Sequence, residues 1–398
     1  MIKSFRVKNY KALRDVSVDL TPIHVLIGPN DTGKTSILEA IAALCRSVDH
    51  HLEAAFLGRW EGQSLAWKGT PRLPIYLSGI VEDYGHLFQY ELSCLVGPNG
   101  RAVQVEAEKV ILGGPQDSQV VSLLQDKSSV SNVSLVVMHN QPRSEDATNV
   151  AHLVHEALAE VHLYRWNPRL LALPVAPDSK RRFRMEPSGF GFALCLDDIL
   201  GYDRELFTRM ETRFRKIFPH IKSIKLMPER AYRAPVDYPQ GIDMLEEADG
   251  KGLYFQLGES GQLVPASQVS DGVLLVLAYL TILHLPKPPR VVLVEEPENG
   301  IHPKRLQDVL GILRDLVAEQ GRTQVILTTH SPYVVDLFKP EEVSVCLKSD
   351  DGSVSVHALS KSKTVREQLD VFTLGEIWTA EGDEAIAGSS TPDAEIKP

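Results

Sequence analysis

The stretch GPNDTGKT, residues 28–35, most constrains what this chain can fold into. It matches G-x-x-x-x-G-K-[ST] and follows an apolar segment, IHVLIG, that reads as a strand. The residues after it place Ile37, Leu38, Ile41 and Leu44 on one helical face. Loop amides and a helix N-terminus bind phosphate because they lack helical hydrogen-bond partners and carry positive partial charge. The sequence therefore predicts a nucleotide-binding loop within an α/β sheet.

Individual roles in this loop follow from its chemistry. We expect Lys34 to reach the β- and γ-phosphates and the Thr35 hydroxyl to bind Mg²⁺. An incidental glycine turn is the alternative, which the flanking strand and helix disfavour. The full set expected to contact the nucleotide from this loop is Gly28, Pro29, Asn30, Asp31, Thr32, Gly33, Lys34, Thr35 and Ser36.

A second apolar strand, VVLVEE at residues 291–296, ends in two carboxylates. In phosphate-loop NTPases a neighbouring strand ends in an acidic residue near the metal. We expect Glu295 to hold Mg²⁺ directly or through water, and Glu296 to polarise the attacking water. A solvent-exposed strand end is the alternative. Glu295 stands where Asp is usual, so a bridging water and a low intrinsic rate are plausible.

The order of elements after residue 250 predicts a mostly parallel sheet. The expected sequence is strand, helix, strand (291–295), helix (304–319), strand (323–328), helix (332–338) and strand (342–348).

The earlier part of the chain gives a different pattern. Residues 74–112 predict antiparallel strands, with a turn at 98–100. Residues 150–218 have the spacing of helices, and 113–148 are too polar to assign.

Three further stretches carry a family resemblance. SQVSDG at 267–272 resembles the signature motif of ABC-type ATPases, PENGIHP at 297–303 resembles their D-loop, and ILTTHSP at 326–332 resembles the switch-histidine segment. Their order, together with FRVKNYKALRDVSVDL at the start, is similar to the ABC-type heads of the RecF/SMC-like and OLD-like families. The chain is similar in particular to compact AAA family ATPases.

This resemblance implies an ABC-type P-loop NTPase head of the α/β class. It would have a mostly parallel sheet, an antiparallel β subdomain and a helical lid insertion. The implied divisions are the N-terminal half of the head at 1–150, a mainly helical basic lid at 151–235, the C-terminal half at 236–378 and a disordered acidic tail at 379–398.

The resemblance also implies roles for three residues outside the phosphate loop. Ser270 would cap the signature helix and, with the Gly272 amide, present donors to the γ-phosphate of ATP on a second subunit. His330 would contact the γ-phosphate. Two heads would then close head to tail on ATP, as a homodimer or within a larger oligomer. Without the family, Ser270 is a helix N-cap and His330 a polar residue at a strand end.

Charge gives one clue to partners. The net charge is −10, yet residues 162–235 hold 15 Lys/Arg and 8 Asp/Glu, which leaves this segment at +7 and the remainder at −17. A solvated basic face is one interpretation, and a surface for DNA or a partner is the other. The residues proposed for such a surface are Arg181, Arg182, Arg184, Arg213, Arg215 and Lys216.

The predicted function is an ATPase that dimerises on ATP and acts in DNA repair or defence against foreign DNA. Because only about 50 residues follow the strand at 342–348, too few for the Toprim nuclease of OLD-like proteins, a separate nuclease-type effector is expected. The alternative is a slowly hydrolysing, nucleotide-gated scaffold that restrains an effector. A transporter subunit fits poorly, because of the N-terminal strand pattern and the insertion at 74–235.

Location follows from two further observations. The four cysteines are scattered and suit a reducing cytoplasm. The longest uncharged apolar run, at 272–286, is shorter than the roughly 20 residues that span a bilayer. We therefore expect no membrane span.

Overall fold

The computed structural model describes residues 1–56, 65–68, 70, 73–97, 103–113, 119–122, 145–178, 182–233, 246–258 and 261–388. Several expectations fall outside these residues: the turn at 98–100, the role of Arg181, and the tail beyond 388. The chain divides into two compact units. Unit 1 holds residues 1–163, 289–295 and 322–398, and unit 2 holds 164–288 and 296–321.

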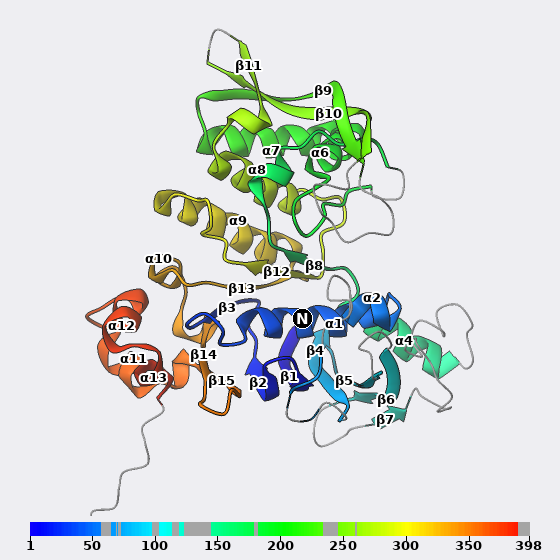
Figure 1. Ribbon diagram of the computed structural model, residues 1–398, viewed down its shortest axis with the longest axis vertical. Helices are drawn as coiled ribbons and strands as arrows, with labels where there is room; N and C mark the ends of the chain where they lie inside the picture. Colours follow the sequence, from blue (N-terminus) through cyan, green and yellow to red (C-terminus); the bar gives the residue numbers. More distant parts are fainter. Residues whose placement is uncertain are drawn as a thin grey trace, which may run out of the picture. The chain divides into compact units, whose positions relative to one another are not determined.

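Unit 1 contains the mostly parallel sheet that the sequence predicts (Figure 1). Strands β3, β12, β13 and β14 run parallel, and β15 is antiparallel to β14. The order across this sheet is β15 (Val354–Ala358), β14 (Val343–Lys348), β3 (Ile23–Ile27), β13 (Gln324–Thr328), β12 (Val291–Glu295) and β8 (Val161–Tyr164).

A second sheet in unit 1 is antiparallel, which confirms the interpretation of 74–112. Its order is β2 (Leu13–Asp19), β1 (Ile2–Tyr10), β4 (Ile75–Asp83), β5 (His86–Val96), β6 (Val103–Leu112) and β7 (Gln119–Ser122).

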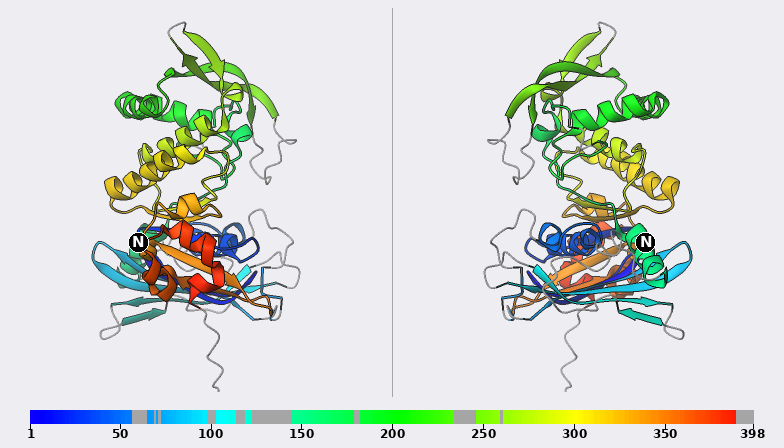
Figure 2. Two further views of the ribbon diagram at one scale, coloured as in Figure 1. Left: turned by 90° about the vertical axis from the view of Figure 1, so that its left-hand side faces the viewer. Right: turned by 90° about the vertical axis from the view of Figure 1, so that its right-hand side faces the viewer.

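Helix α1 (Lys34–Ser47) lies between the two sheets (Figures 1 and 2). Its buried residues include Ile37, Leu38 and an unbroken run from Ala40 to Cys45, so the helix is covered on nearly every side. Side chains from both sheets join it in one core. Two further helices of the described N-terminal residues are α2 (Leu52–Phe56) and α4 (Glu145–Leu158).

A disordered tail was expected from residue 379, but the structure contains helices up to residue 387. Residues 379–388 lie in and after two short helices, where Thr373 caps α12 through a reciprocal capping box. The last elements are α10 (Pro332–Val335), η5 (Pro340–Glu342), η6 (Leu359–Lys361), α11 (Lys363–Gln368), α12 (Leu374–Glu381) and α13 (Asp383–Ala387).

Unit 2 differs from the expected helical lid in its limits and its content. It begins at Tyr164, so α4 belongs to unit 1, and it includes a three-stranded sheet in the order β11–β10–β9. The strand expected between residue 250 and the following helix belongs to this antiparallel sheet, not to the parallel one. Strand β9 was not predicted, because its mixed polar and apolar residues have no clear period. The elements are α5 (Pro168–Leu171), α6 (Phe192–Tyr202), α7 (Arg204–Ile217), β9 (Ile221–Arg233), β10 (Glu246–Leu257), β11 (Gln262–Pro265), η4 (Ala266–Gln268), α8 (Asp271–Leu283) and α9 (Pro303–Gln320).

Helix α7 follows the predicted amphipathic pattern. Phe207, Met210 and Phe214 are buried on one face. The Asp203 carboxylate caps its first turn by accepting hydrogen bonds from two backbone amides. Among the helices of the described residues, none is both long and apolar enough to cross a membrane.

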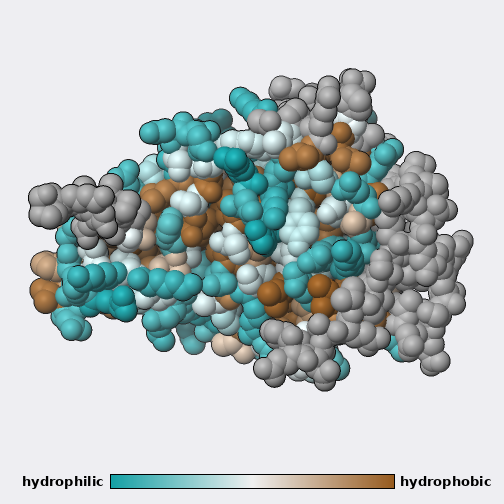
Figure 3. All heavy atoms as spheres, turned by 90° about the horizontal axis from the view of Figure 1, so that it is seen from below, coloured by the Kyte–Doolittle hydropathy of each residue, from teal (hydrophilic) through white to brown (hydrophobic). Residues whose placement is uncertain are grey.

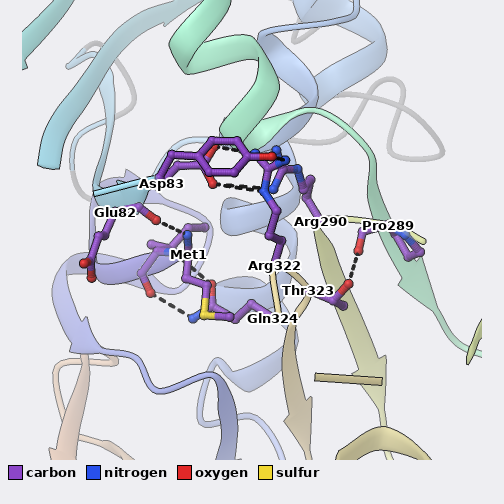
Figure 4. Close-up of polar contacts among 10 residues, drawn as sticks. Met1, Glu82, Asp83, Pro289, Arg290, Arg322, Thr323 and Gln324 are labelled. Carbon is purple, nitrogen blue, oxygen red and sulfur yellow. Dashed lines mark hydrogen bonds and ion pairs between the residues drawn. The ribbon is translucent and has the colours of Figure 1, made fainter. Parts of the chain in front are cut away.

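A polar network joins the two sheets of unit 1 (Figure 4). The Asp83 side chain, 6% exposed, accepts from Arg322 at 2.8 Å and lies 3.5 Å from an Arg290 nitrogen. The Gln324 side chain bonds both the amide and the carbonyl of Ile2, at 2.9 and 2.8 Å. These contacts hold the N-terminal strand of one sheet against β13 of the other.

Replacing Asp83 with Ala should lower the free energy of unfolding by about 2–4 kcal/mol, because two partly buried guanidinium groups lose their carboxylate. Urea unfolding measures the change. Asp15→Ala is the matched control, since its partner Arg6 is half exposed and the expected loss is below about 1 kcal/mol. Equal losses for the two variants would contradict the role of the Asp83 network.

Candidate functional site

The phosphate loop connects β3 to α1 and depends on two glycines in the left-handed region. Gly28 has φ 131° and Gly33, the N-cap of α1, has φ 82°. A Cβ at Gly28 would lie 2.4 Å from the carbonyl oxygen of Cys346 on β14. Only glycine therefore allows the loop to pass this close to the neighbouring strand.

Lys34 lies inside the loop and is 6% exposed. Its ammonium donates to the carbonyls of Gly28 and Pro29 at 2.8 and 2.7 Å, and the Thr32 hydroxyl donates to Pro29 at 2.9 Å. A buried ammonium within a ring of backbone groups at a helix N-terminus fits a polyphosphate ligand. The residues present thus suit the nucleotide that the sequence predicts.

Parallel strands bring the other predicted residues of unit 1 to the same edge of the sheet. Glu295 pairs with Thr328, which pairs with Leu26, so β12, β13 and β3 end close to one level. Glu295 is the last residue of β12 and His330 lies two residues beyond the end of β13; both are half-buried and close to the level at which β3 enters the phosphate loop. Thr35 lies in the first turn of α1 and is also half-buried. A hydroxyl and a carboxylate are oxygen ligands that Mg²⁺ accepts.

Glu296 has a backbone conformation that is uncommon for its residue type. Its φ is 47°, in the left-handed region, which costs about 1–3 kcal/mol for a side chain of this kind. Asn299 holds the turn twice: its amide donates to the Glu296 carbonyl at 3.0 Å, and its side-chain nitrogen donates to the Glu296 carboxylate at 2.6 Å. The turn therefore fixes the direction of this carboxylate.

Asn299 is a site residue that sequence reasoning missed. The Asn-Gly pair in PENGIHP was visible as a turn, but nothing in the sequence indicated that the Asn side chain bonds the second glutamate. Gly300, with φ 80°, completes the turn.

The signature-like motif lies in unit 2. Ser270 is the N-cap of α8 by backbone position, and its carbonyl accepts from the Val273 amide at 3.0 Å. Its hydroxyl makes no capping hydrogen bond within the described residues, which corrects the expected side-chain cap. The hydroxyl is then available to another acceptor. A Cβ at Gly300 would meet Asp271 at 3.5 Å, so the D-loop-like turn packs against the start of α8, beside Gly272.

Two protein-family models match the chain. One, "AAA domain, putative AbiEii toxin, Type IV TA system", matches residues 166–336, and the other, "AAA ATPase domain", matches residues 1–74.

Several characterised proteins are similar in sequence. The "ATP/GTP phosphatase" of Helicobacter pylori is 21% identical over 382 residues, covering 89% of this chain and 94% of that protein. The "OLD nuclease" of Thermus scotoductus is 21% identical over 364 residues, covering 89% of this chain and 64% of that nuclease. "DNA replication and repair protein RecF" of Lactococcus lactis is 34% identical over 110 residues, covering 24% of this chain and 30% of that protein.

Among solved structures, an SMC head bound to the C-winged helix domain of ScpA is similar at a TM-score of 0.49 and 13% identity. The match covers 89% of this chain and 97% of that chain.

Asn299→Ala should lower nucleotide turnover about tenfold and leave KM little changed, because the Glu296 carboxylate loses the donor that orients it. Steady-state kinetics test this split between kcat and KM. Gln307→Ala, at an exposed position of α9, is a control expected to keep wild-type kinetics. A raised KM with an unchanged kcat in Asn299→Ala would contradict the orienting role.

Proposed function

We propose that this chain is an ATPase of the AAA/ABC type, related to RecF and OLD, which binds Mg²⁺-ATP in the phosphate loop and hydrolyses it. The observation that carries the proposal is the common edge of the parallel sheet. The phosphate loop, Glu295 and His330 follow three neighbouring strands that end there.

Each residue then has a defined task. Loop amides and Lys34 bind the phosphates, while Thr35 and Glu295 hold the metal. Bound Mg²⁺ would neutralise charge on the phosphate oxygens. Glu296 accepts a hydrogen bond from the attacking water and polarises it, and His330 donates to the γ-phosphate. Because Glu295 replaces the shorter Asp, its metal contact can pass through a water, which suits slow turnover.

Glu296→Gln should retain ATP binding while turnover falls by about 10²–10⁴-fold, because the amide cannot accept the proton of the attacking water. Lys34→Ala should instead lose ATP binding, since the cation inside the loop is removed. Fluorescent-nucleotide titration and phosphate release separate the two effects. Wild-type turnover in Glu296→Gln would remove this residue from the role of base.

We also propose that two chains close head to tail on ATP. The support is Ser270, whose hydroxyl makes no capping bond within the described residues, beside the Gly272 amide at the N-terminus of α8. A helix N-terminus with free donors suits a γ-phosphate. In this arrangement the γ-phosphate belongs to ATP in the other copy, so ATP joins the two heads and hydrolysis releases them.

We also propose that the chain acts on DNA. Fewer basic residues are exposed and unpaired in unit 2 than its sequence alone indicates. Unit 2 as a whole contains 20 Lys/Arg and 20 Asp/Glu, so the basic segment is balanced by other parts of its own unit. Arg213 pairs with Asp315, and Arg182 lies 4.0 Å from Asp198. The exposed basic face of α7 remains, with Arg209, Arg215 and Lys216. It is the surface that we propose contacts DNA phosphates.

Replacing Arg209, Arg215 and Lys216 together with Gln should weaken binding to double-stranded DNA at low salt at least about tenfold. The slope of log K against log salt should fall by up to about 3, because each neutralised phosphate releases counterions. Fluorescence anisotropy across a salt series measures both quantities. A control neutralises Arg14, Lys361 and Lys363, whose side chains are 65–81% exposed in unit 1. Equal losses in both triple variants would refute the α7 surface.

The second candidate function is a nucleotide-gated scaffold that hydrolyses ATP slowly and restrains an effector protein. Glu295 in place of Asp favours it. Turnover in the presence and absence of DNA separates the two functions: DNA stimulation supports repair or defence against foreign DNA, whereas slow turnover indifferent to DNA supports the scaffold. The four cysteines are free and buried, which suits the cytoplasm as the proposed location.

A further inference from the structure

Helix α12 connects two parts of the nucleotide site within unit 1. At its start, the Gly375 amide donates to the Asp336 carboxylate of α10 at 2.7 Å. A Cβ at Gly375 would lie 2.4 Å from the carbonyl oxygen of Pro332, two residues after His330. Only glycine permits this contact, so α12 is packed directly against the segment that carries the switch histidine.

The other end of α12 approaches the phosphate loop. Residues 381–384, at the turn between α12 and α13, line a cavity of about 500 Å³ together with Pro29, Asn30 and Thr32. One short helix therefore contacts the histidine segment at its start and borders the phosphate loop at its end. A shift of either segment on nucleotide binding would be transmitted to α12.

An exposed apolar surface lies beside the start of α12. It consists of Tyr333, Leu369, Val371 and Phe372, which are 66%, 39%, 75% and 52% exposed, and we name it the cap patch. The turn that carries three of them is ordered by hydrogen bonds from the amides of Val371 and Phe372 to the Gln368 carbonyl. Hydrophobic atoms are visible at the left edge of Figure 3, the side on which Figure 1 draws α11–α13. Clustered exposed apolar side chains of this kind mark interaction surfaces.

The charge around the cap patch limits what can bind there. Residues 363–388 contain six Asp/Glu and two Lys/Arg, a net charge of −4. Glu367, Asp370 and Glu376 are exposed next to the patch in sequence. An acidic rim repels nucleic acids and anionic membranes and attracts Lys and Arg. A second copy of the chain complements an acidic rim less well, because its unit 1 has a net charge of −10 and its unit 2 has no net charge.

We propose that the cap patch is the docking surface for a separate protein, through a segment with apolar anchors flanked by Lys or Arg. The packing of α12 against α10 and its approach to the phosphate loop couple this surface to the bound nucleotide. The proposal rests on the proposed function, in that it names where an effector would bind. It differs from an ATP-closed dimer or a DNA complex, neither of which needs the patch.

The probe is a fluorescein-labelled synthetic peptide of about 16 residues, with Leu and Phe on one helical face and Lys on the other. Its matched partner carries Glu in place of Lys. Anisotropy should show binding of the Lys peptide to the full-length chain and at least about tenfold weaker binding to Phe372→Ser, because an exposed anchor contact is lost. The Glu peptide should bind at least tenfold more weakly to the wild type. Leu263→Ser, 45% exposed in unit 2, is the matched control and should bind like wild type.

Three outcomes would overturn the proposal. Equal binding of the Lys peptide to wild type and Phe372→Ser would show that the patch is not the site. Loss of ATP-dependent dimers in Phe372→Ser, measured by light scattering, would make the patch a contact between copies. Binding to phosphatidylglycerol vesicles that is lost in Phe372→Ser would make it a membrane contact. ATP turnover measured on the same proteins tests the proposed function separately.

A separate variant tests the coupling between the bound nucleotide and the cap patch. Gly375→Ala forces α12 away from Pro332, so the difference in peptide affinity between ATP-bound Glu296→Gln and nucleotide-free protein should shrink at least threefold. Gly311→Ala is the control, since a Cβ there meets nothing within 4 Å and the helix should tolerate it. If Gly375→Ala unfolds, hydrogen exchange of residues 369–376 in the parent protein provides the second measurement. Exchange that is unchanged by ATP would refute the coupling.

Discussion

The buried helix α1 is the element on which the rest of the structure depends. It fills the space between an antiparallel and a mostly parallel sheet, so nearly all its residues must be apolar or small. Its N-terminus must nevertheless carry free amides, because that end forms the phosphate loop. Gly33 and Lys34 satisfy both requirements. Gly33 begins the helix in a left-handed conformation, and the Lys34 ammonium donates hydrogen bonds to the loop carbonyls. The helix therefore holds the fold together and positions the site.

The same arrangement explains what the sequence could predict. A strand, a glycine loop and a helix form a local unit, and parallel strands with apolar runs end at one edge, so the places of Lys34 and Glu295 follow from order and spacing. His330 was indicated by the family resemblance instead. The sheet of β9, β10 and β11 was not predictable in the same way. Its strands alternate irregularly, so neither face could be assigned, although Pro235, Pro239 and Gly241 between β9 and β10 favour a turn.

Side-chain contacts were the least predictable part. The bond from Asn299 to Glu296 depends on a left-handed backbone at a glutamate, which no propensity favours. Ser270 has the residue type and the backbone position of an N-cap, as predicted. Its hydroxyl nevertheless makes no hydrogen bond to the helix amides, which residue type and position cannot indicate. The helices after residue 373 were hidden by a composition rich in small and acidic residues. A capping box at Thr373 and Glu376 starts α12 there.

The boundary between the two units falls between Glu295 and Glu296. Glu295 ends a strand of unit 1, whereas Glu296 begins the part of unit 2 that includes the D-loop-like turn. The peptide between them therefore connects the carboxylate assigned to the metal with the one assigned to the water. Asn299 fixes Glu296 to its own turn, and Gly300 packs that turn against the start of α8. The direction of the Glu296 carboxylate is thus set within unit 2, which also carries the signature-like motif. In the dimer that we propose, a second copy engaged at Ser270 would act on Glu296 through this turn.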